Sequence, residues 1–588
     1  MACPSAGHAA GQAAQISRSG GFDTPCRRAA AALLLLLLLL LIPATARAQR
    51  QMVAAAHPLA AEAGMAMLRA GGTAIDAAIA TQVMLGLVEP QSSGLGGGAL
   101  ALYWDAATRH LSAWDGREVA PAAAPPTLFL KDGQPMAFLA AAIGGRAVGV
   151  PGAMRMLEAL HKAQGRLPWA ALFAPAIAAA ENGVPVTPRL AALIAQDAAH
   201  LAQDREARAL FLPDGKPLPA GATLRNPAYA ATLRAIAEQG AEALHRGPIA
   251  AEIAAAIRAH ANPGLMTTDD LAGYAPKQRE ALCGPYRGVT VCGFPPPSSG
   301  GATVLQILGI LAHQSLAGLD PRGLDAAHLL GEAGRIAFAD RNRYLADADQ
   351  VPVPLRGLLD PTYLLLRAQL LDRDHALAAP RAGNPPWQDG AALASQPPQP
   401  EGGTSHVSIV DAEGNALAMT STIEDLFGAR LMVRGFFLNN ELTDFSFLPE
   451  IEGRPVANRV GPGKRPRSSM SPTIVFGADG LPMLLLGSAG GSRIIGHVAQ
   501  TLVALLDWGL EPQAAVSLPR IGALNAGLEL EAGTGAAALA PGLEARGFPV
   551  ELRTMTSGLH VIRILRGAEG VRLQGGADPR REGVALGD

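Results

Sequence analysis

The feature that most constrains the fold is an abrupt change in the chain at residue 404. Residues 378–403 are rich in Pro, Gly, Gln and Ser, which is typical of a flexible linker. Before this stretch, most of 150–370 is Ala- and Leu-rich and predicts helices, whereas short alternating runs after it predict a β-rich part. The 588-residue chain is therefore expected to join a mainly helical part to a mainly β part, in several domains or one large composite core.

A β-hairpin is predicted directly after the linker. Residues 404–410 alternate in character, Asp411–Asn415 carries a turn signal, and Ala416–Thr422 reads as the returning strand. If the turn is centred on Glu413, Thr404 faces Thr422 across the pair, on one side of the sheet. An extra residue in the turn would shift this register.

Other elements follow from periodicity. Gly94–Gly98 precedes a predicted strand instead of opening a helix, which favours close backbone packing over phosphate binding. Near the start of the mature chain we predict strands at 52–55 and 99–104 and helices at 59–69 and 74–87. In the β-rich part we predict strands at 431–438, 473–476, 481–487, 547–552, 558–565 and 571–574, with helices at 492–508 and 512–517.

Residues 1–48 are predicted to be a signal peptide. Arg27 and Arg28 belong to a positive n-region, residues 29–42 are an unbroken apolar run, and Ala46-Arg47-Ala48 is an A-x-A cleavage site. The mature chain would begin near Gln49 and be exported, to the periplasm or the extracellular space. An uncleaved anchor is the alternative, although a membrane span needs about 20 apolar residues. No second long apolar run follows, so we expect no membrane association after signal removal.

Composition narrows the function further. Hydrophobic residues make up 49% and charged residues 17%, as in a globular protein, and a net charge of -2 without a basic stripe argues against a nucleic-acid partner. No HExxH, CxxC or EF-hand pattern occurs, so we predict no metal and no cofactor. Outside the leader, Cys283 and Cys292 flank a strand-like segment and form either a disulfide or two free buried thiols.

Six short motifs stand in a fixed order along the chain. They are Asp115–Glu118, Pro295–Gly301, Gly402–Asp411, Leu438–Glu441 with Asp444–Ser446, Lys464–Met470 and Gly487–Arg493. Together they resemble the γ-glutamyltranspeptidase (γ-glutamyltransferase) family of the N-terminal-nucleophile hydrolase superfamily, from about residue 52 to the C-terminus. The resemblance implies an α/β (α+β) fold, a four-layer αββα sandwich built from two chains of one precursor.

The resemblance also implies that the precursor cleaves itself between Gly403 and Thr404. The products would be a large subunit, 49–403, and a small catalytic subunit, 404–588, which remain together as a heterodimer. A threonine hydroxyl needs a base, and the α-amine freed by cleavage, with a pKa of about 7.7–8.0, can serve. Glycine at position 403 tolerates the strained backbone that such a cut requires. The alternative for Thr404 is an ordinary strand threonine.

The resemblance assigns roles around this nucleophile. Thr422 would hydrogen-bond the Thr404 hydroxyl, and the backbone N–H groups of Gly490 and Gly491 would form an oxyanion hole. A plain tight turn is the alternative for this glycine pair. His406 matches a motif position, but we interpret it as a packing residue without a catalytic role.

The remaining motif residues suit the head of a γ-glutamyl group. Arg117 would bind the α-carboxylate as a bidentate partner, with hydroxyl donors from Ser468 and Ser469. Glu441 and Asp444, at the other end, would hold the α-ammonium. The alternative for Arg117 is a surface ion pair with a neighbouring acid of its own motif.

Two departures from the family pattern affect the donor. Glu424 stands where many members have asparagine, and a carboxylate there could contact the ammonium but would repel the α-carboxylate. The stretch 447–467, which carries the family's lid loop, is short. A shorter lid would admit bulkier donors or more water and favour hydrolysis over transfer.

The sequence therefore predicts a γ-glutamyl hydrolase and transferase that acts on glutathione or related compounds and passes the acyl group to water or to an amino-acid or peptide acceptor. One alternative is an amidase like the glutaryl or cephalosporin acylases, with the same fold and mechanism. Another is a secreted, unprocessed binding protein. A classical serine hydrolase is disfavoured because Gly487–Gly490 lacks the G-x-S-x-G spacing.

Overall fold

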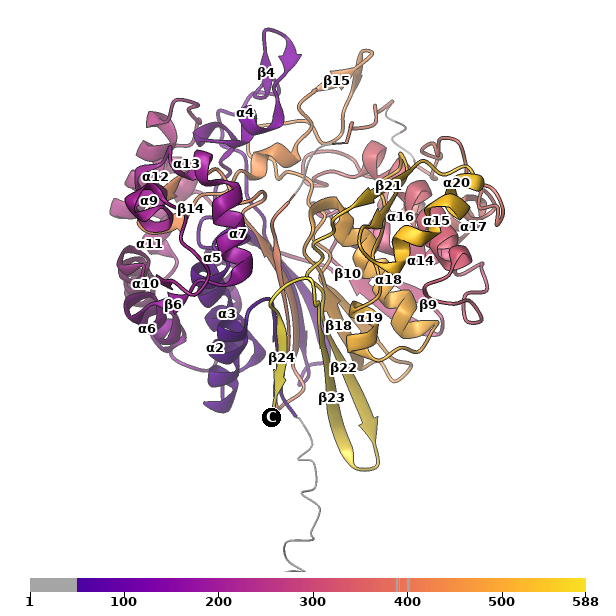
Figure 1. Cartoon of the computed structure of the whole chain (residues 1–588), viewed down its shortest axis with the longest axis horizontal. Helices are drawn as coiled ribbons and strands as arrows, with labels where there is room; N and C mark the ends of the chain where they lie inside the picture. The colour runs from indigo at the N-terminus through magenta and orange to yellow at the C-terminus, as the bar shows by residue number, and fades with distance from the viewer. Residues whose placement is uncertain (1–49, 388–389, 391, 399–401) are drawn as a thin grey trace, which may run out of the picture. The chain divides into compact units, whose positions relative to one another are not determined.

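Two antiparallel β-sheets lie face to face, and helices cover the outer face of each (Figure 1). The computed structural model describes residues 50–387, 390, 392–398 and 402–588. The predicted signal peptide, 1–48, lies outside the described residues, as do six positions of the predicted linker. The αββα sandwich expected from the sequence is confirmed.

The two sheets differ in size. The first has seven strands, in the order β24 (Val584–Gly587), β1 (Met52–Ala55), β11 (Ser405–Val410), β12 (Ala416–Thr422), β2 (Gly98–Asp105), β3 (His110–Gly116) and β8 (Lys277–Arg279). The second has six, in the order β23 (Gly570–Ala577), β22 (His560–Gly567), β18 (Pro482–Gly487), β17 (Thr473–Phe476), β10 (Val289–Gly293) and β9 (Leu282–Tyr286).

Side chains of the central strands alternate between two apolar layers, as the period of a strand requires. In β11, Val407 and Ile409 pack with the helical layer, whereas Val410 packs between the sheets. In β12, Leu417 packs with the helices and Ala418 between the sheets. Both faces of this hairpin are buried, which fixes its register.

The helices divide between the two outer faces. α3 begins at a capping box formed by Thr73 and Asp76, and every residue of it is buried, as expected for a helix that is apolar all round. Helices in the apolar layer of the first sheet are α2 (Pro58–Arg69), α3 (Ala74–Val88), α5 (Ala153–Gln164), α6 (Ala174–Asn182), α7 (Pro188–Gln196), α8 (Ala198–Leu201), α9 (Arg205–Phe211), α10 (Pro227–Gln239), α11 (Glu242–His245), α12 (Gly247–Ala259) and α13 (Thr268–Ala272). Those in the layer of the second sheet are α14 (Gly300–Leu311), α15 (Leu324–Tyr344), α17 (Pro361–Ala368), α18 (Ile494–Leu506) and α19 (Pro512–Val516).

Smaller elements complete the described chain. The remaining α-helices are α4 (Phe138–Ala142), α16 (Leu355–Leu358) and α20 (Ala540–Ala545), and two short 3-10 helices, η4 (Glu441–Asp444) and η5 (Gly491–Arg493), carry motif residues. Short strands form four two-stranded sheets and a three-stranded sheet: β4 (Leu130–Lys131) with β5 (Gln134–Pro135), β6 (Val184–Pro185) with β7 (Thr223–Leu224), β13 (Met432–Val433) with β14 (Phe436–Phe437), β15 (Glu450–Ile451) with β16 (Arg454–Pro455), and β19 (Ile521–Ala523) with β20 (Leu528–Glu531) and β21 (Val550–Arg553). Among the described residues, no helix combines the length and the apolar character that a membrane crossing requires.

The predicted hairpin register is confirmed. Ser405 pairs with Ser421 and Val410 with Ala416, so the pairing is centred on Glu413 without a bulge. One strand prediction is wrong. Residues 431–438 turn back on themselves, because Arg434 and Gly435 both have positive φ and form a two-residue hairpin loop. The 547–552 run corresponds to β21, which pairs in parallel with β20 in a separate sheet.

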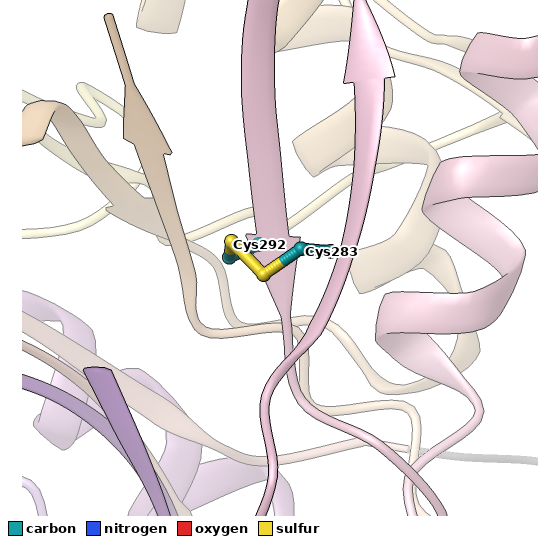
Figure 2. The surroundings of a disulfide bond; sticks show 2 residues. All are labelled: Cys283 and Cys292. Carbon is teal, nitrogen blue, oxygen red and sulfur yellow. A yellow bond between two sulfur atoms is a disulfide. The ribbon is translucent and has the colours of Figure 1, made fainter. Parts of the chain in front are cut away.

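The cysteine pair lies at the edge of the second sheet. Cys283 in β9 is directly opposite Cys292 in β10, with the two Cα atoms 4.1 Å apart, and their side chains form a disulfide (Figure 2). Of the two possibilities left open by the sequence, the structure has the disulfide. It joins the edge strand β9 to its neighbour.

Candidate active site

Thr404 lies immediately before β11, at the open end of the β11–β12 hairpin in the middle of the first sheet. Its side chain is buried, and its Oγ1 lies 3.3 Å from Oγ1 of Thr422 at the end of β12. This contact follows from the hairpin register and brings together the two threonines that the sequence predicts to face each other.

The backbone on both sides of the Gly403–Thr404 bond is in the left-handed region. The φ angles are 61° at Gly403 and 81° at Thr404. A positive φ is unusual for a β-branched residue, and such outliers cost on the order of 1–3 kcal/mol each. A Cβ atom at position 403 would lie 2.0 Å from the carbonyl oxygen of Glu424, so no larger residue fits there without displacing the backbone. The bond predicted to break therefore lies in strained, tightly packed backbone.

Two residues that the sequence interpretation missed hold the main chain of Thr404. The Thr404 N–H donates to the carbonyl of Ser92 (3.1 Å), and its carbonyl accepts from Nη1 of Arg581 (2.8 Å). Burial lowers the pKa of Arg581 to about 10, so its guanidinium remains charged at neutral pH, and the carboxylate of Glu89 lies 3.8 Å away. No local sequence pattern links these positions to Thr404.

The glycine loop before β2 packs against the other threonine. A Cβ atom at Gly97 would lie 1.9 Å from the carbonyl oxygen of Thr422. Close backbone packing, which the sequence favours over phosphate binding for Gly94–Gly98, is therefore what the structure shows.

Arg117 follows β3 directly, and its side chain is completely buried. Its guanidinium pairs with Glu441 and Asp444 of η4 through separate nitrogens, and Nη1 lies 3.5 Å from the Glu118 carboxylate. Its Nε also donates to the carbonyl of Pro466 (3.1 Å). The sequence interpretation puts Arg117 and the two acids at opposite ends of a ligand, but here they contact one another. The ion pair considered as an alternative exists with Glu118, and it is buried.

Burial dominates the electrostatics of these acids. It raises the pKa of Glu441 to about 8 and that of Glu118 to about 7, although Arg117 opposes the shift in both cases. Burial, together with Asp425, Asp444 and Glu441, also raises the pKa of Glu424 well above its usual value. One guanidinium thus serves several buried carboxyl groups whose pKa values are raised by burial.

Glu424 faces the pocket from the turn after β12. Its N–H donates to Oγ1 of Thr422 (2.8 Å), and its Oε2 accepts from the amide of Asn440. Its other oxygen, Oε1, is buried and has no hydrogen-bond partner among the described residues. Buried oxygens of this kind are normally satisfied, so Oε1 is available to a donor group on a ligand. Asn440 lies in one of the six motifs, but the sequence interpretation gave it no role.

The loop that carries Ser468 and Ser469 is held from the helical layer. Oγ of Ser469 accepts from Nη2 of Arg341 in α15 (2.6 Å), and Oγ of Ser299 donates to the carbonyl of Ser468 (2.7 Å). The Pro295–Gly301 motif, which had no assigned role, therefore positions the serine loop.

Gly490 and Gly491 connect β18 to η5 and α18. Both have positive φ, 125° and 59°. A Cβ atom at Gly490 would stand 3.1 Å from Cε1 of His497, whose pKa is lowered by burial to about 3, so that its ring is neutral. The two glycines allow the backbone to turn between the sheet and the helix.

A single pocket collects nearly all of the predicted site residues. It has about 250 Å³ of empty space, part of it open to solvent. Its lining comprises Arg117, Gly402, Thr404, Thr422, Glu424, Glu441, Asp444, Ser468, Ser469, Met470, Gly491 and Ile494. Among the predicted residues, Gly403 and Gly490 do not line it. We call it the donor pocket.

His406 lies outside the donor pocket. Its ring nitrogens are 2.8 Å from Oγ1 of Thr420 and 3.1 Å from Oγ of Ser408, and burial, reinforced by His560, lowers its pKa well below the usual value. This neutral, hydrogen-bonded histidine agrees with its interpretation as a packing residue.

Two antiparallel sheets between helical layers, with a threonine buried at the start of a central strand, define the N-terminal-nucleophile hydrolase class. A cephalosporin acylase from Bacillus halodurans has a similar structure, with a TM-score of 0.80 and 30% identity over 92% of this chain and 96% of that one. The sequence is 41% identical to a glutathione hydrolase proenzyme of Bacillus subtilis over 80% of both chains. It is 37% identical to the acylase ACY 1 proenzyme of a Pseudomonas strain over 85% of this chain and 87% of that one. Residues 60–588 match the gamma-glutamyltranspeptidase family, and the chain belongs to that family.

Proposed function

We propose that this chain is a self-processing γ-glutamyltransferase and glutathione hydrolase whose nucleophile is Thr404. The observation that carries the proposal is the donor pocket, whose lining places the Thr404 hydroxyl together with a buried guanidinium and several carboxyl groups. Family membership and the glutathione hydrolase proenzymes among its relatives support the same reaction.

Processing comes first. The Thr404 hydroxyl attacks the carbonyl carbon of Gly403, and the C–N bond breaks as an ester forms with Thr404 Oγ1. Water then hydrolyses the ester, which leaves a carboxylate on Gly403 and a free α-amine on Thr404. The positive φ angle at the β-branched Thr404 favours the cut because cleavage releases the backbone strain there. The products are the large subunit, 49–403, and the small subunit, 404–588, which stay together because the sheets contain strands of both.

The freed amine then serves as the base. It takes the hydroxyl proton of Thr404 while Oγ1 attacks the γ-carbonyl of the donor, and the N–H groups of Gly490 and Gly491 stabilise the oxyanion. The leaving amine takes up that proton, and the γ-glutamyl ester on Thr404 passes to water or to an amino-acid or peptide acceptor. Arg581 holds the Thr404 carbonyl, so the residue keeps its orientation after cleavage.

Donor recognition rests on an exchange of partners. The α-carboxylate of a bound donor pairs with Arg117, Ser468 and Ser469, and its α-ammonium pairs with Glu441 and Asp444. Each charged side chain that loses its present ion pair therefore gains one with the donor. The unpartnered Oε1 of Glu424 accepts from the same ammonium, which would make this carboxyl group a ligand where many family members have asparagine.

A glutaryl or cephalosporin acylase is the second candidate, because relatives with acylase names and a cephalosporin acylase fold are similar to this chain. A glutaryl donor has no ammonium and would leave the carboxyl groups of the donor pocket without a cationic partner. The carboxyl-rich donor pocket therefore favours the γ-glutamyl donor. An unprocessed binding protein is the third candidate.

We also propose that the protein is exported and loses residues 1–48. The apolar run and the A-x-A site support this proposal, as does the Cys283–Cys292 disulfide, since disulfides persist mainly in oxidising compartments.

The test compares two amides that differ only in the α-amino group, a γ-glutamyl amide and a glutaryl amide of the same amine. The proposed function predicts cleavage of the γ-glutamyl amide with at least about tenfold higher kcat/KM, which corresponds to one good ionic contact. Preference for the glutaryl amide would support the acylase. No turnover of either by an uncut chain would support the binding protein.

A further inference from the structure

A second hollow opens beside the donor pocket, and its walls are apolar. It has about 610 Å³ of empty space, part of it open to solvent. Its lining comes from three segments of the chain, which contribute Met136 and Phe138, the Pro397–Pro398 pair, and Phe447 and Leu448. We call it the apolar hollow.

The hollow and the donor pocket share one segment of chain. Glu441 and Asp444 of η4 line the donor pocket, and Ser446, Phe447 and Leu448 line the hollow. Only Phe445 separates Asp444 from Ser446, so their Cα atoms lie within about 8 Å of each other. The two spaces are therefore lined by neighbouring residues of the same short segment.

Asn458 fixes the walls relative to one another. Its side-chain Nδ2 donates to the carbonyl of Asp444 (2.7 Å) and to Oε1 of Gln396 (2.9 Å), and its backbone carbonyl accepts from the N–H of Ser446 (2.8 Å). Gln396 directly precedes Pro397. Asn458 thus connects the segment 444–446 to Gln396, the residue before the Pro397–Pro398 pair.

The lining gives the hollow a definite chemistry. Phe447, which lines the hollow, is stacked on Phe129 with ring centroids 4.5 Å apart, and this contact holds its ring in place. The lining includes no charged side chain, and the hydroxyl of Ser446 already donates to the carbonyl of Leu448 (2.8 Å). Aromatic and branched aliphatic groups gain most from such a surface.

We propose that the apolar hollow binds the amine side of the reaction, which is the leaving group of the donor amide and the side chain of an incoming acceptor, and that it prefers aromatic or branched aliphatic groups. This inference rests on the proposed function. The charges of the donor pocket match the γ-glutamyl head, and the part of the substrate beyond the scissile bond carries the variable side chain. The hollow is the adjoining space whose chemistry suits such a side chain.

The experiment uses the processed enzyme and two dipeptides with the same head, γ-glutamyl-phenylalanine and γ-glutamyl-glycine. The wild-type enzyme is expected to have a KM about tenfold lower for the phenylalanine dipeptide. Phe138→Ser is expected to remove most of that difference by raising only the KM for γ-glutamyl-phenylalanine. Leu139→Ser is the matched control, because Leu139 lies on the same helix, is 45% exposed and does not line the hollow.

Each outcome has one meaning. If the wild-type enzyme cleaves neither dipeptide, the proposed function fails and the inference fails with it. If it cleaves both with equal KM, or if Phe138→Ser changes both KM values alike, the inference is overturned while the function stands. Met136→Gln repeats the test at a second wall position in case Phe138→Ser does not give two folded chains, and an unchanged ratio of KM values in that variant would also overturn it.

Discussion

The donor pocket and the apolar hollow are lined by neighbouring parts of the segment 441–448, yet they differ in chemistry. The donor pocket surrounds Thr404 with buried carboxyl groups and one guanidinium, so each group depends on a partner. The hollow is lined by side chains that make no ionic contact, so a substitution there changes only the apolar area offered to a ligand. The comparison shows why effects should be large and dependent on pH in one space but modest in the other.

The largest expected effect is at Thr404. Thr404→Ala removes the hydroxyl that we propose attacks Gly403 and the donor, so we expect no processing and no turnover above background. Intact mass and a γ-glutamyl amide assay measure both. Thr404→Ser is the matched control, because it keeps the hydroxyl and is expected to process, more slowly. A cleaved and active Thr404→Ala protein would remove the nucleophile from this position.

Arg117 tests the charge balance of the donor pocket. Arg117→Lys keeps the charge but loses the two-pronged geometry, so we expect processing to continue and KM for γ-glutamyl donors to rise by about 100-fold. Arg117→Ala also leaves Glu441 and Asp444 without their cation, which can cost about 3–5 kcal/mol of stability. Thermal unfolding separates the two variants, and an unchanged KM in Arg117→Lys would show that the residue does not contact the donor.

The pH dependence of stability tests the buried acids. Glu441 has a pKa of about 8 in the folded protein, and an unperturbed glutamate has one of about 4.3. Between these values the unfolded chain releases a proton that the folded chain keeps, so stability falls as pH rises from about 4.5 to 8. Glu441→Gln cannot release that proton. Its Tm is therefore expected to decline less than the wild-type Tm across this range, and parallel curves would contradict the raised pKa.

The smallest effect on activity is expected at the disulfide. It lies at the edge of the second sheet, and its cysteines line neither the donor pocket nor the apolar hollow. Replacing both Cys283 and Cys292 by Ala opens a short loop and should cost about 2–3 kcal/mol of stability. The kinetic constants for γ-glutamyl donors should not change, as steady-state assays below the lowered Tm can check. A loss of kcat would mean that the edge of the second sheet controls the donor pocket.

Local patterns predicted the parts of the fold in which neighbouring residues decide the structure. The hairpin around Glu413 is one example, because alternation and the turn signal fix its register without other contacts. The run 431–438 shows the limit of this reasoning. Its apolar and aromatic residues suggest a strand, but the Arg434-Gly435 turn divides it.

The candidate site was predictable where motifs carry it. The motifs identified ten of the residues that line the donor pocket or flank the proposed cleavage site, but not how their charges pair. Arg581 and Arg341 reach Thr404 and Ser469 across 177 and 128 positions of sequence, and only the packed fold brings them together. The contact between Arg117 and the acids of η4 could not be predicted for the same reason.

The most direct test of the central claim is an intact-mass and N-terminal analysis of the purified protein. The account predicts two chains that copurify, one of which begins at Thr404 and ends at Asp588. A single uncut chain that remains folded, or a cut at any other bond, would contradict Thr404 as the N-terminal nucleophile.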